Sequence, residues 1–182
     1  MSEEQQQPFD ILQRMQQQAA AAGYVLPELT QTEERWHGLA FAVGSLRLTS
    51  ELTAFTDIVE CGAVTPVPLT RGWVRGVTNV RGSLLSVVDF AQFLGHPRIN
   101  MDTEGKLLVI NDGELGCALL VNSVLGMRRF DQENEYRDAT VMDRTVQPFV
   151  RHAYLQDGQL WGVLDTDKLK ASDEFRNVAA DN

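Results

Sequence analysis

The sequence has few cysteines and no long apolar run. Its 182 residues include two cysteines, Cys61 and Cys117, and neither belongs to a Cys-x-x-Cys pair. Isolated cysteines without a secretory signal are typical of a reduced, cytoplasmic protein. The first ten residues, MSEEQQQPFD, lack the basic and apolar parts of a signal peptide, and no run approaches the roughly 18 apolar residues of a membrane span. We therefore expect a cytoplasmic protein that does not insert into a membrane.

The sequence also has fewer basic than acidic residues. The chain has 16 lysines and arginines against 25 aspartates and glutamates, so its net charge is −9. A phosphate backbone would be repelled by this balance, and the sequence shows no face that combines basic and aromatic residues. We therefore expect no nucleic-acid partner.

The usual signatures of catalysis and metal binding are missing. The three histidines, His37, His96 and His152, have no partner at metal-ligand spacing, and the glycines form neither a phosphate-binding loop nor a dinucleotide fingerprint. Asp89 and Asp165 each follow a strand-like run and precede a helix-like one, which is typical of an N-cap rather than of a catalytic pair. We expect no enzyme activity, no cofactor and no metal site.

A period of two dominates the sequence from Trp36 onward, which predicts a mainly β protein. A hairpin with a Gly44-Ser45 turn should bury Leu46, Leu48 and Leu52 on one face only. Residues 131–145 have no clean period and are predicted to be a long polar connection, and residues 166–175 are helix-like. Asp112-Gly113 and Asp157-Gly158 are expected turns. Further strands are expected at 55–62, 73–80, 83–90, 106–111, 115–122, 124–130, 149–155 and 159–165.

An internal repeat suggests two related halves. Residues 73–94 align without gaps on residues 149–170, and both segments share the order strand, turn glycine, strand, aspartate and helix. We expect two small barrels of about five strands each, because closure removes exposed sheet edges. The identities fall at Val74/Val150, Arg75/Arg151, Gly82/Gly158, Leu84/Leu160, Val87/Val163 and Asp89/Asp165.

Residues 1–35 differ from the remainder, which we take as one domain over 36–178. The segment PFDILQRMQQQAAAAG at 8–23 begins with a proline, ends with a glycine and predicts a short, weakly amphipathic helix, followed by a polar linker. This extension either packs lightly on the domain or docks on a partner.

The stretch GVTNVRGSLLSVVDF at 76–90 resembles the signature G-V-I-N-L-R-G-x-x-x-P-V-I-D-L of the CheW-like chemotaxis coupling proteins. The resemblance runs from about Trp36 to Phe175. It implies a CheW-like fold of two interleaved five-stranded β-barrel subdomains with a groove between them. Thr78, Val80, Ser86 and Phe90 depart from the signature, but none of them removes the turn. The matching positions are Gly76, Val77, Asn79, Arg81, Gly82, Val87 and Asp89.

The resemblance also implies a function and partners. Members of the family are non-catalytic scaffolds that join the regulatory domain of a CheA-like histidine kinase to the cytoplasmic tip of a methyl-accepting receptor. The segments PFDILQRM, WVRGVTNVRG and LGMRRF resemble the branch of the family that serves type IV pilus twitching motility. The alternatives are a coupling protein of another chemosensory array, such as a flagellar one, and a small-ligand-binding barrel.

The resemblance places Arg81 at the tip of a hairpin and implies that Asp57 pairs with it. Arg81 either contacts a partner while Asp57 orients it, or forms a purely structural pair. Arg75 is expected to be a solvated strand residue. Gly76, Gly82 and Asp89 are expected to be structural. The candidates for kinase or receptor contact are Asp57, Ile58, Val59, Val77, Asn79, Val80, Arg81, Leu125 and Met127.

Overall fold

The structure is a computed structural model that describes residues 35–101, 105–111 and 116–178. Residues 34–182 form one compact unit, and only this unit is described below. The helix expected at 8–23, nearly all of the 1–35 extension and the Asp112-Gly113 turn lie outside the described residues.

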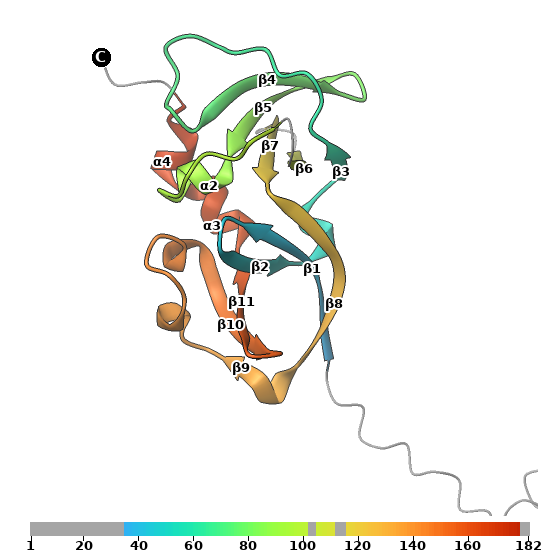
Figure 1. The fold of residues 1–182 in the computed structure, drawn as a ribbon, viewed down its shortest axis with the longest axis vertical. Helices are drawn as coiled ribbons and strands as arrows, with labels where there is room; N and C mark the ends of the chain where they lie inside the picture. Colours follow the sequence, from blue (N-terminus) through green and yellow to red (C-terminus); the bar gives the residue numbers. More distant parts are fainter. Residues whose placement is uncertain (1–34, 102–104, 112–115, 179–182) are drawn as a thin grey trace, which may run out of the picture. The chain divides into compact units, whose positions relative to one another are not determined.

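The described residues form two β-sheets (Figure 1), which confirms the prediction of a mainly β protein. The first sheet has the strand order β8-β1-β2-β11-β10-β9. All neighbours in it are antiparallel except β11 and β2, which are parallel. Its strands are β1 Arg35–Val43, β2 Leu46–Ser50, β8 Ser123–Asp131, β9 Glu135–Tyr136, β10 Val150–Gln156 and β11 Gln159–Leu164.

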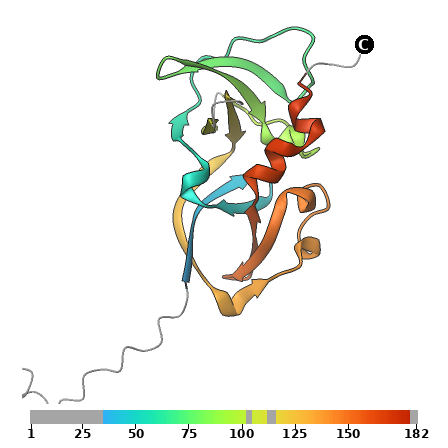
Figure 2. The same ribbon diagram turned by 180° about the vertical axis from the view of Figure 1, so that it is seen from behind.

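The second sheet has the order β3-β6-β7-β5-β4, with β5 and β7 parallel and the other neighbours antiparallel. The chain therefore contributes two strands to the first sheet, builds the whole second sheet, and then returns along β8 to the first (Figures 1 and 2). Its strands are β3 Asp57–Glu60, β4 Val74–Val80, β5 Ser83–Asp89, β6 Lys106–Asn111 and β7 Gly116–Val121.

Two expectations about the first sheet are wrong. The segment at 131–145 is not a plain connection, because η2 Gln132–Asn134, β9 and η3 Ala139–Val141 lie in it. β9 pairs with β10 and brings this sheet to six strands, which is close to the expected number of about five. β2 is also not one-sided: Thr49 is as buried as Leu48, while Leu52 is exposed on η1 Leu52–Ala54. The reason is that the other face of this sheet is covered too: Ala40, opposite Thr49, belongs to a second buried cluster with Phe130, Tyr154 and Trp161.

The internal repeat is confirmed by the order of the elements. The β4–β5 hairpin leads through Asp89 into α2 Phe90–Phe93, and the β10–β11 hairpin leads through Asp165 into α3 Thr166–Ala171. Each hairpin turns through a residue of positive φ followed by glycine, Arg81-Gly82 and Asp157-Gly158. Two such residues give the turn twist that matches the right-handed twist of the flanking strands.

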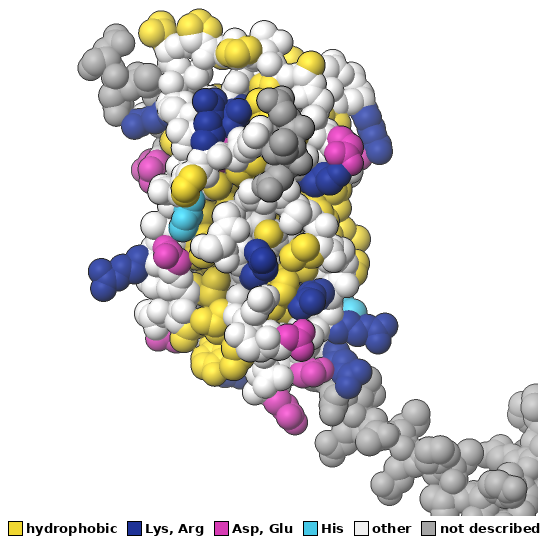
Figure 3. Space-filling view, in the orientation of Figure 1, with side chains coloured by type: hydrophobic (Ala, Val, Ile, Leu, Met, Phe, Trp, Pro, Cys, Tyr) yellow, Lys and Arg dark blue, Asp and Glu magenta, His cyan; other side chains and the backbone are white. Residues whose placement is uncertain are grey.

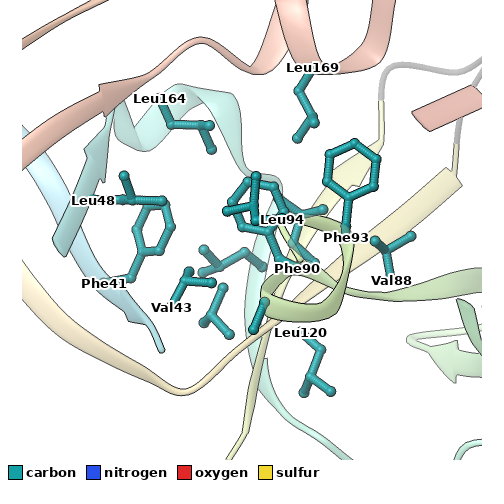
Figure 4. Packing of buried hydrophobic residues seen from close by; sticks show 14 of the residues in the cluster. Phe41, Val43, Leu48, Val88, Phe90, Phe93, Leu94, Leu120, Leu164 and Leu169 are labelled. Carbon is teal, nitrogen blue, oxygen red and sulfur yellow. The ribbon is translucent and has the colours of Figure 1, made fainter. Parts of the chain in front are cut away.

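One apolar core joins the two sheets. Phe41 and Leu48 of the first sheet belong to the same buried cluster as Phe90 and Leu120, and Leu169 of α3 joins them (Figure 4). In Figure 2, α3 and the following α4 Asp173–Arg176 lie beside the junction of the sheets. η4 Gln147–Phe149 adds Phe149 to this core. A second, mainly aromatic cluster is formed by Ala40, Phe130, Tyr154, Trp161 and Val163.

None of the helices in the described part of the chain is both long enough and apolar enough to cross a membrane.

Candidate functional site

Arg81 lies at the tip of the β4–β5 hairpin and pairs with Asp57, as the resemblance implies. Its Nη1 is 2.9 Å from Oδ1 of Asp57, and its side chain is 76% exposed while that of Asp57 is 22% exposed. Asp57 begins β3, and β3 and β4 are the two edge strands of the second sheet. The ion pair therefore connects the hairpin tip to the opposite edge of its own sheet.

The backbone at this tip is strained for an arginine. Arg81 has φ +49° and is followed by Gly82 at φ +88°. The left-handed region costs a residue with a side chain about 1–2 kcal/mol, and asparagine or glycine suits it better. An exposed ion pair contributes only about 0–1 kcal/mol in return. Neither the turn nor the ion pair therefore requires an arginine at this position.

The side-chain oxygen of Asn79 stabilises the turn from within the chain. Its Oδ1 accepts a hydrogen bond from the Gly82 amide at 3.0 Å. Val77, two residues earlier, exchanges two backbone hydrogen bonds with Thr65, each 2.8 Å long. These contacts fix the conformation in which the hairpin presents Arg81.

The apolar candidates divide into exposed and packed side chains. Ile58, next to Asp57, is exposed, whereas Val59 and Val80 are partly buried and pack against the main core. Leu84 of β5 is exposed beside the tip and was missed from the sequence. The adjacent Leu84 and Leu85 were a usable signal, because neighbouring strand residues face opposite sides of a sheet, and here Leu85 is buried while Leu84 is exposed.

Leu125 and Met127 lie on β8 and are both exposed. They belong to the first sheet and Ile58 to the second, so the sequence candidates are spread over both sheets. β3 and β8 follow the same edge of the described unit in Figures 1 and 2, and Figure 3 shows hydrophobic side chains gathered over β8. The exposed Leu52 of η1 lies on the chain between β2 and β3.

The prediction that Arg75 is solvated is wrong. Its side chain is only 9% exposed, and its Nη1 donates at 3.0 Å to Oδ2 of Asp89, a fully buried carboxylate, and at 3.0 Å to the Ile99 carbonyl. Asp89 also accepts from the amides of Gln92 and Ile99, both at 3.0 Å, and its predicted role as an N-cap is confirmed. A register shift between Val74 and Gly76 accompanies this burial.

The second half repeats this pair in a more open setting. Arg151 Nε donates to Asp165 Oδ2 at 2.9 Å, and Asp165 caps α3 by accepting from the amides of Asp167 and Lys168. Arg151 is 43% exposed and also lies 3.5 Å from Glu51. The two arginines and the two aspartates are identical positions of the internal repeat. The repeat could therefore have predicted two equivalent ion pairs.

The pair at Asp165 predicts a dependence of stability on pH. Hydrogen bonding from Arg151, and secondarily from the Lys168 amide, holds the pKa of Asp165 below its usual value. Because the folded-state pKa lies below the unfolded value of about 3.9, the stabilisation is complete above about pH 5 and is lost as the pH falls through the folded-state pKa. The free-energy difference between wild type and Asp165→Asn in urea unfolding should therefore shrink from pH 6 to pH 3. A constant difference would contradict this assignment.

Reactive groups are scarce in the described part of the chain. Burial raises the pKa of the Cys61 thiol, which disfavours the nucleophilic thiolate. Nε2 of His96 lies 3.3 Å from Oγ1 of Thr145. Among residues 35–101, 105–111 and 116–178, no three His, Cys, Asp or Glu side chains come together as a metal site would require.

Comparison with known proteins places this geometry in a family. Residues 37–174 match the CheW-like domain. Protein PilI of Pseudomonas aeruginosa is 26% identical over 174 residues, which cover 96% of this chain and 97% of that protein. Chemotaxis protein CheW of Thermotoga maritima is 30% identical over 133 residues, which cover 72% and 85%.

A solved structure shares the fold. The crystal structure of the scaffolding protein TtCheW from Thermoanaerobacter tengcongensis matches with a TM-score of 0.60 and 16% identity, covering 70% of this chain and 87% of that one. The two sheets, the signature hairpin and the match over most of the chain agree: the chain belongs to the CheW-like domain family.

Proposed function

We propose that this protein is a non-catalytic coupling scaffold of a chemosensory array. It joins the regulatory domain of a CheA-like histidine kinase to the cytoplasmic tip of a methyl-accepting receptor, in signalling that controls type IV pilus twitching motility. Support comes from the CheW-like domain and from the similarity to PilI along nearly the whole chain. The kinase and the receptor are partners proposed from the family.

The observation that carries the proposal is the exposed guanidinium of Arg81 on a disfavoured backbone. Asp57 orients this group, and the exposed Leu84 and Ile58 lie near the ends of the pair. An oriented arginine beside apolar side chains is typical of the residues that dominate protein interfaces, each contributing about 2 kcal/mol or more. We assign this surface to the kinase domain.

The receptor is assigned to the exposed side chains near the junction of the sheets. Leu125 and Met127 on β8 offer exposed aliphatic contacts, and β8 belongs to the other sheet from Arg81 and Asp57. A helix hairpin binds such a surface through apolar residues spaced along one face. Two separate surfaces allow both partners to bind at once, as coupling requires.

Arg81→Asn is expected to weaken binding of the kinase regulatory domain about 30-fold or more, the equivalent of about 2 kcal/mol. Asparagine suits the left-handed position, so the turn is kept while the guanidinium is removed. Binding would be measured by calorimetry on the full chain and by co-elution. The melting temperature should change by less than about 2 °C, because an exposed ion pair contributes little.

Two controls make the result specific. Asp157→Asn changes the equivalent turn of the second half and should leave kinase binding intact. Asp57→Asn leaves Arg81 in place but unoriented and should weaken binding less than Arg81→Asn does. Equal binding by all variants would show that Arg81 is structural, and a wild type that never binds the kinase domain would reject the proposed function.

A further inference from the structure

The two arginines of the internal repeat differ in how their donors are used. Nη1 of Arg75 donates to both the Asp89 carboxylate and the Ile99 carbonyl. Arg151 reaches Asp165 through Nε and Nη2, at 2.9 and 3.4 Å, and its Nη1 forms no hydrogen bond within the described part of the chain. Because a guanidinium carries five N–H groups, Arg151 keeps donors for an acceptor from outside the chain.

The first half supplies its own acceptor from the segment that follows α2. Residues 94–100 lead back to Asp89, where the buried Ile99 donates its amide to Asp89 and accepts from Arg75 with its carbonyl. In the second half, only Ser172 separates α3 from α4. Among the described residues, no main-chain carbonyl therefore takes the place of the Ile99 carbonyl at Arg151.

A cleft of about 250 Å³ opens beside Arg151, between η1, β11 and α3. Glu51 lines it, 3.5 Å from Nη1 of Arg151, and Lys170 lines it paired with Asp167 at 3.0 Å. These two cations and two anions balance, so a bound ion would leave a charge unmatched, whereas a neutral acceptor would not. We define the Arg151 cleft by these four charged residues and its apolar lining, which is Ala54, Ile110, Val163 and Leu164.

We propose that the Arg151 cleft binds an extended peptide segment of a partner protein, with a main-chain carbonyl on Arg151 and an aliphatic side chain against the apolar lining. Such a segment reproduces what Ile99 does at Arg75 in the first half. A hydrogen bond from a charged donor to a carbonyl is stronger than one between neutral groups. A second copy cannot supply the segment around Ile99, because Ile99 is buried in its own chain. The proposal does not depend on the proposed coupling function.

A peptide that copies the first-half segment is the probe. Its sequence is that of residues 95–101, GHPRINM, with both ends blocked. Titrated into the isotope-labelled full chain, it should cause saturable shifts of the Arg151 Nε–H signal and of the α3 amide signals in NMR spectra. The peptide GHPRGNM has the same charge and should bind at least about fivefold more weakly, because it buries no aliphatic side chain. Sodium acetate at the same concentration should not displace the probe.

Variants of the full chain test each part of the cleft. Arg151→Lys keeps a cation beside Asp165 but loses the planar fork, and should weaken binding of the probe at least about fivefold. Glu51→Ala removes the carboxylate that competes for Nη1 and should strengthen binding about twofold, because an exposed ion pair is weak. Thr53→Trp places a large side chain at an exposed position of the lining and should block binding.

The controls separate this site from non-specific binding and from a loss of folding. Arg129→Lys changes an exposed arginine on β8 and should bind the probe like the wild type. Glu51→Ala and Thr53→Trp leave the pair between Arg151 and Asp165 in place, and thermal melts check that each variant is folded. Stronger binding by Glu51→Ala is a result that a purely structural role of Arg151 does not predict. The proposal is overturned if the probe does not bind, if acetate displaces it, if the glycine peptide binds equally well, or if Arg129→Lys loses as much binding as Arg151→Lys.

Discussion

Replacing Asp89 with alanine is expected to lower the free energy of unfolding by about 3–5 kcal/mol, the usual cost of breaking a buried ion pair from one side. The fully buried carboxylate accepts from Arg75 and from the Gln92 and Ile99 amides. Without this carboxylate, the nearly buried guanidinium of Arg75 keeps its bond to the Ile99 carbonyl but loses its ionic partner. The amides of Gln92 and Ile99 lose their acceptor. Urea unfolding followed by tryptophan fluorescence would measure the loss, and the melting temperature should fall by about 10 °C.

The internal repeat supplies a matched control for Asp89. Asp165→Ala removes the same kind of cap and ion pair in the second half, but Arg151 is 43% exposed and also lies near Glu51. Water can solvate the freed guanidinium, so a loss of only about 1–2 kcal/mol is expected. If the two substitutions lower the free energy of unfolding equally, burial of the arginine does not determine the size of the loss.

Gly76→Ala is expected to destabilise the protein by about 3 kcal/mol or more. Gly76 has φ +135°, a region nearly closed to other residues, and a Cβ there would overlap the backbone of Thr65 and Pro66. The added methyl would push residues 65–66 away from β4 and break the two hydrogen bonds between Thr65 and Val77. Thermal and urea unfolding would measure the loss.

Gly82→Ala is a control that introduces backbone strain without a steric overlap. Gly82 also has a positive φ, +88°, but no heavy atom lies within 4 Å of a Cβ built on it. Only the strain of the left-handed conformation remains, so a cost of about 1–2 kcal/mol is expected. Equal losses for the two alanine variants would mean that the close approach of residues 65–66 adds nothing to stability.

Much of the local structure could be predicted from the sequence. The turns at Gly44-Ser45 and Arg81-Gly82, the caps at Asp89 and Asp165, and the strand pattern are confirmed. Each rests on neighbours in the chain, because turn conformation, capping and alternation are set within a few residues. The signature also predicted the family and the pairing of Asp57 with Arg81, and both predictions are confirmed.

The tertiary structure decided which side chains are buried. Arg75 and Arg151 occupy equivalent positions in the repeat, but one is enclosed and the other lies partly open to solvent. Leu84 and Leu69 are large apolar residues, and the structure leaves both of them exposed.

The sequence by itself determined where strands begin and turn, which aspartates cap helices, and to which family the chain belongs. Only the tertiary structure decided that β9 adds a sixth strand, that the Arg75–Asp89 pair is buried, and that Leu69 is exposed in a left-handed conformation. The physical reason is that turns and caps depend on local backbone geometry and hydrogen bonds, whereas burial depends on which distant segments pack together, and residue spacing does not specify that.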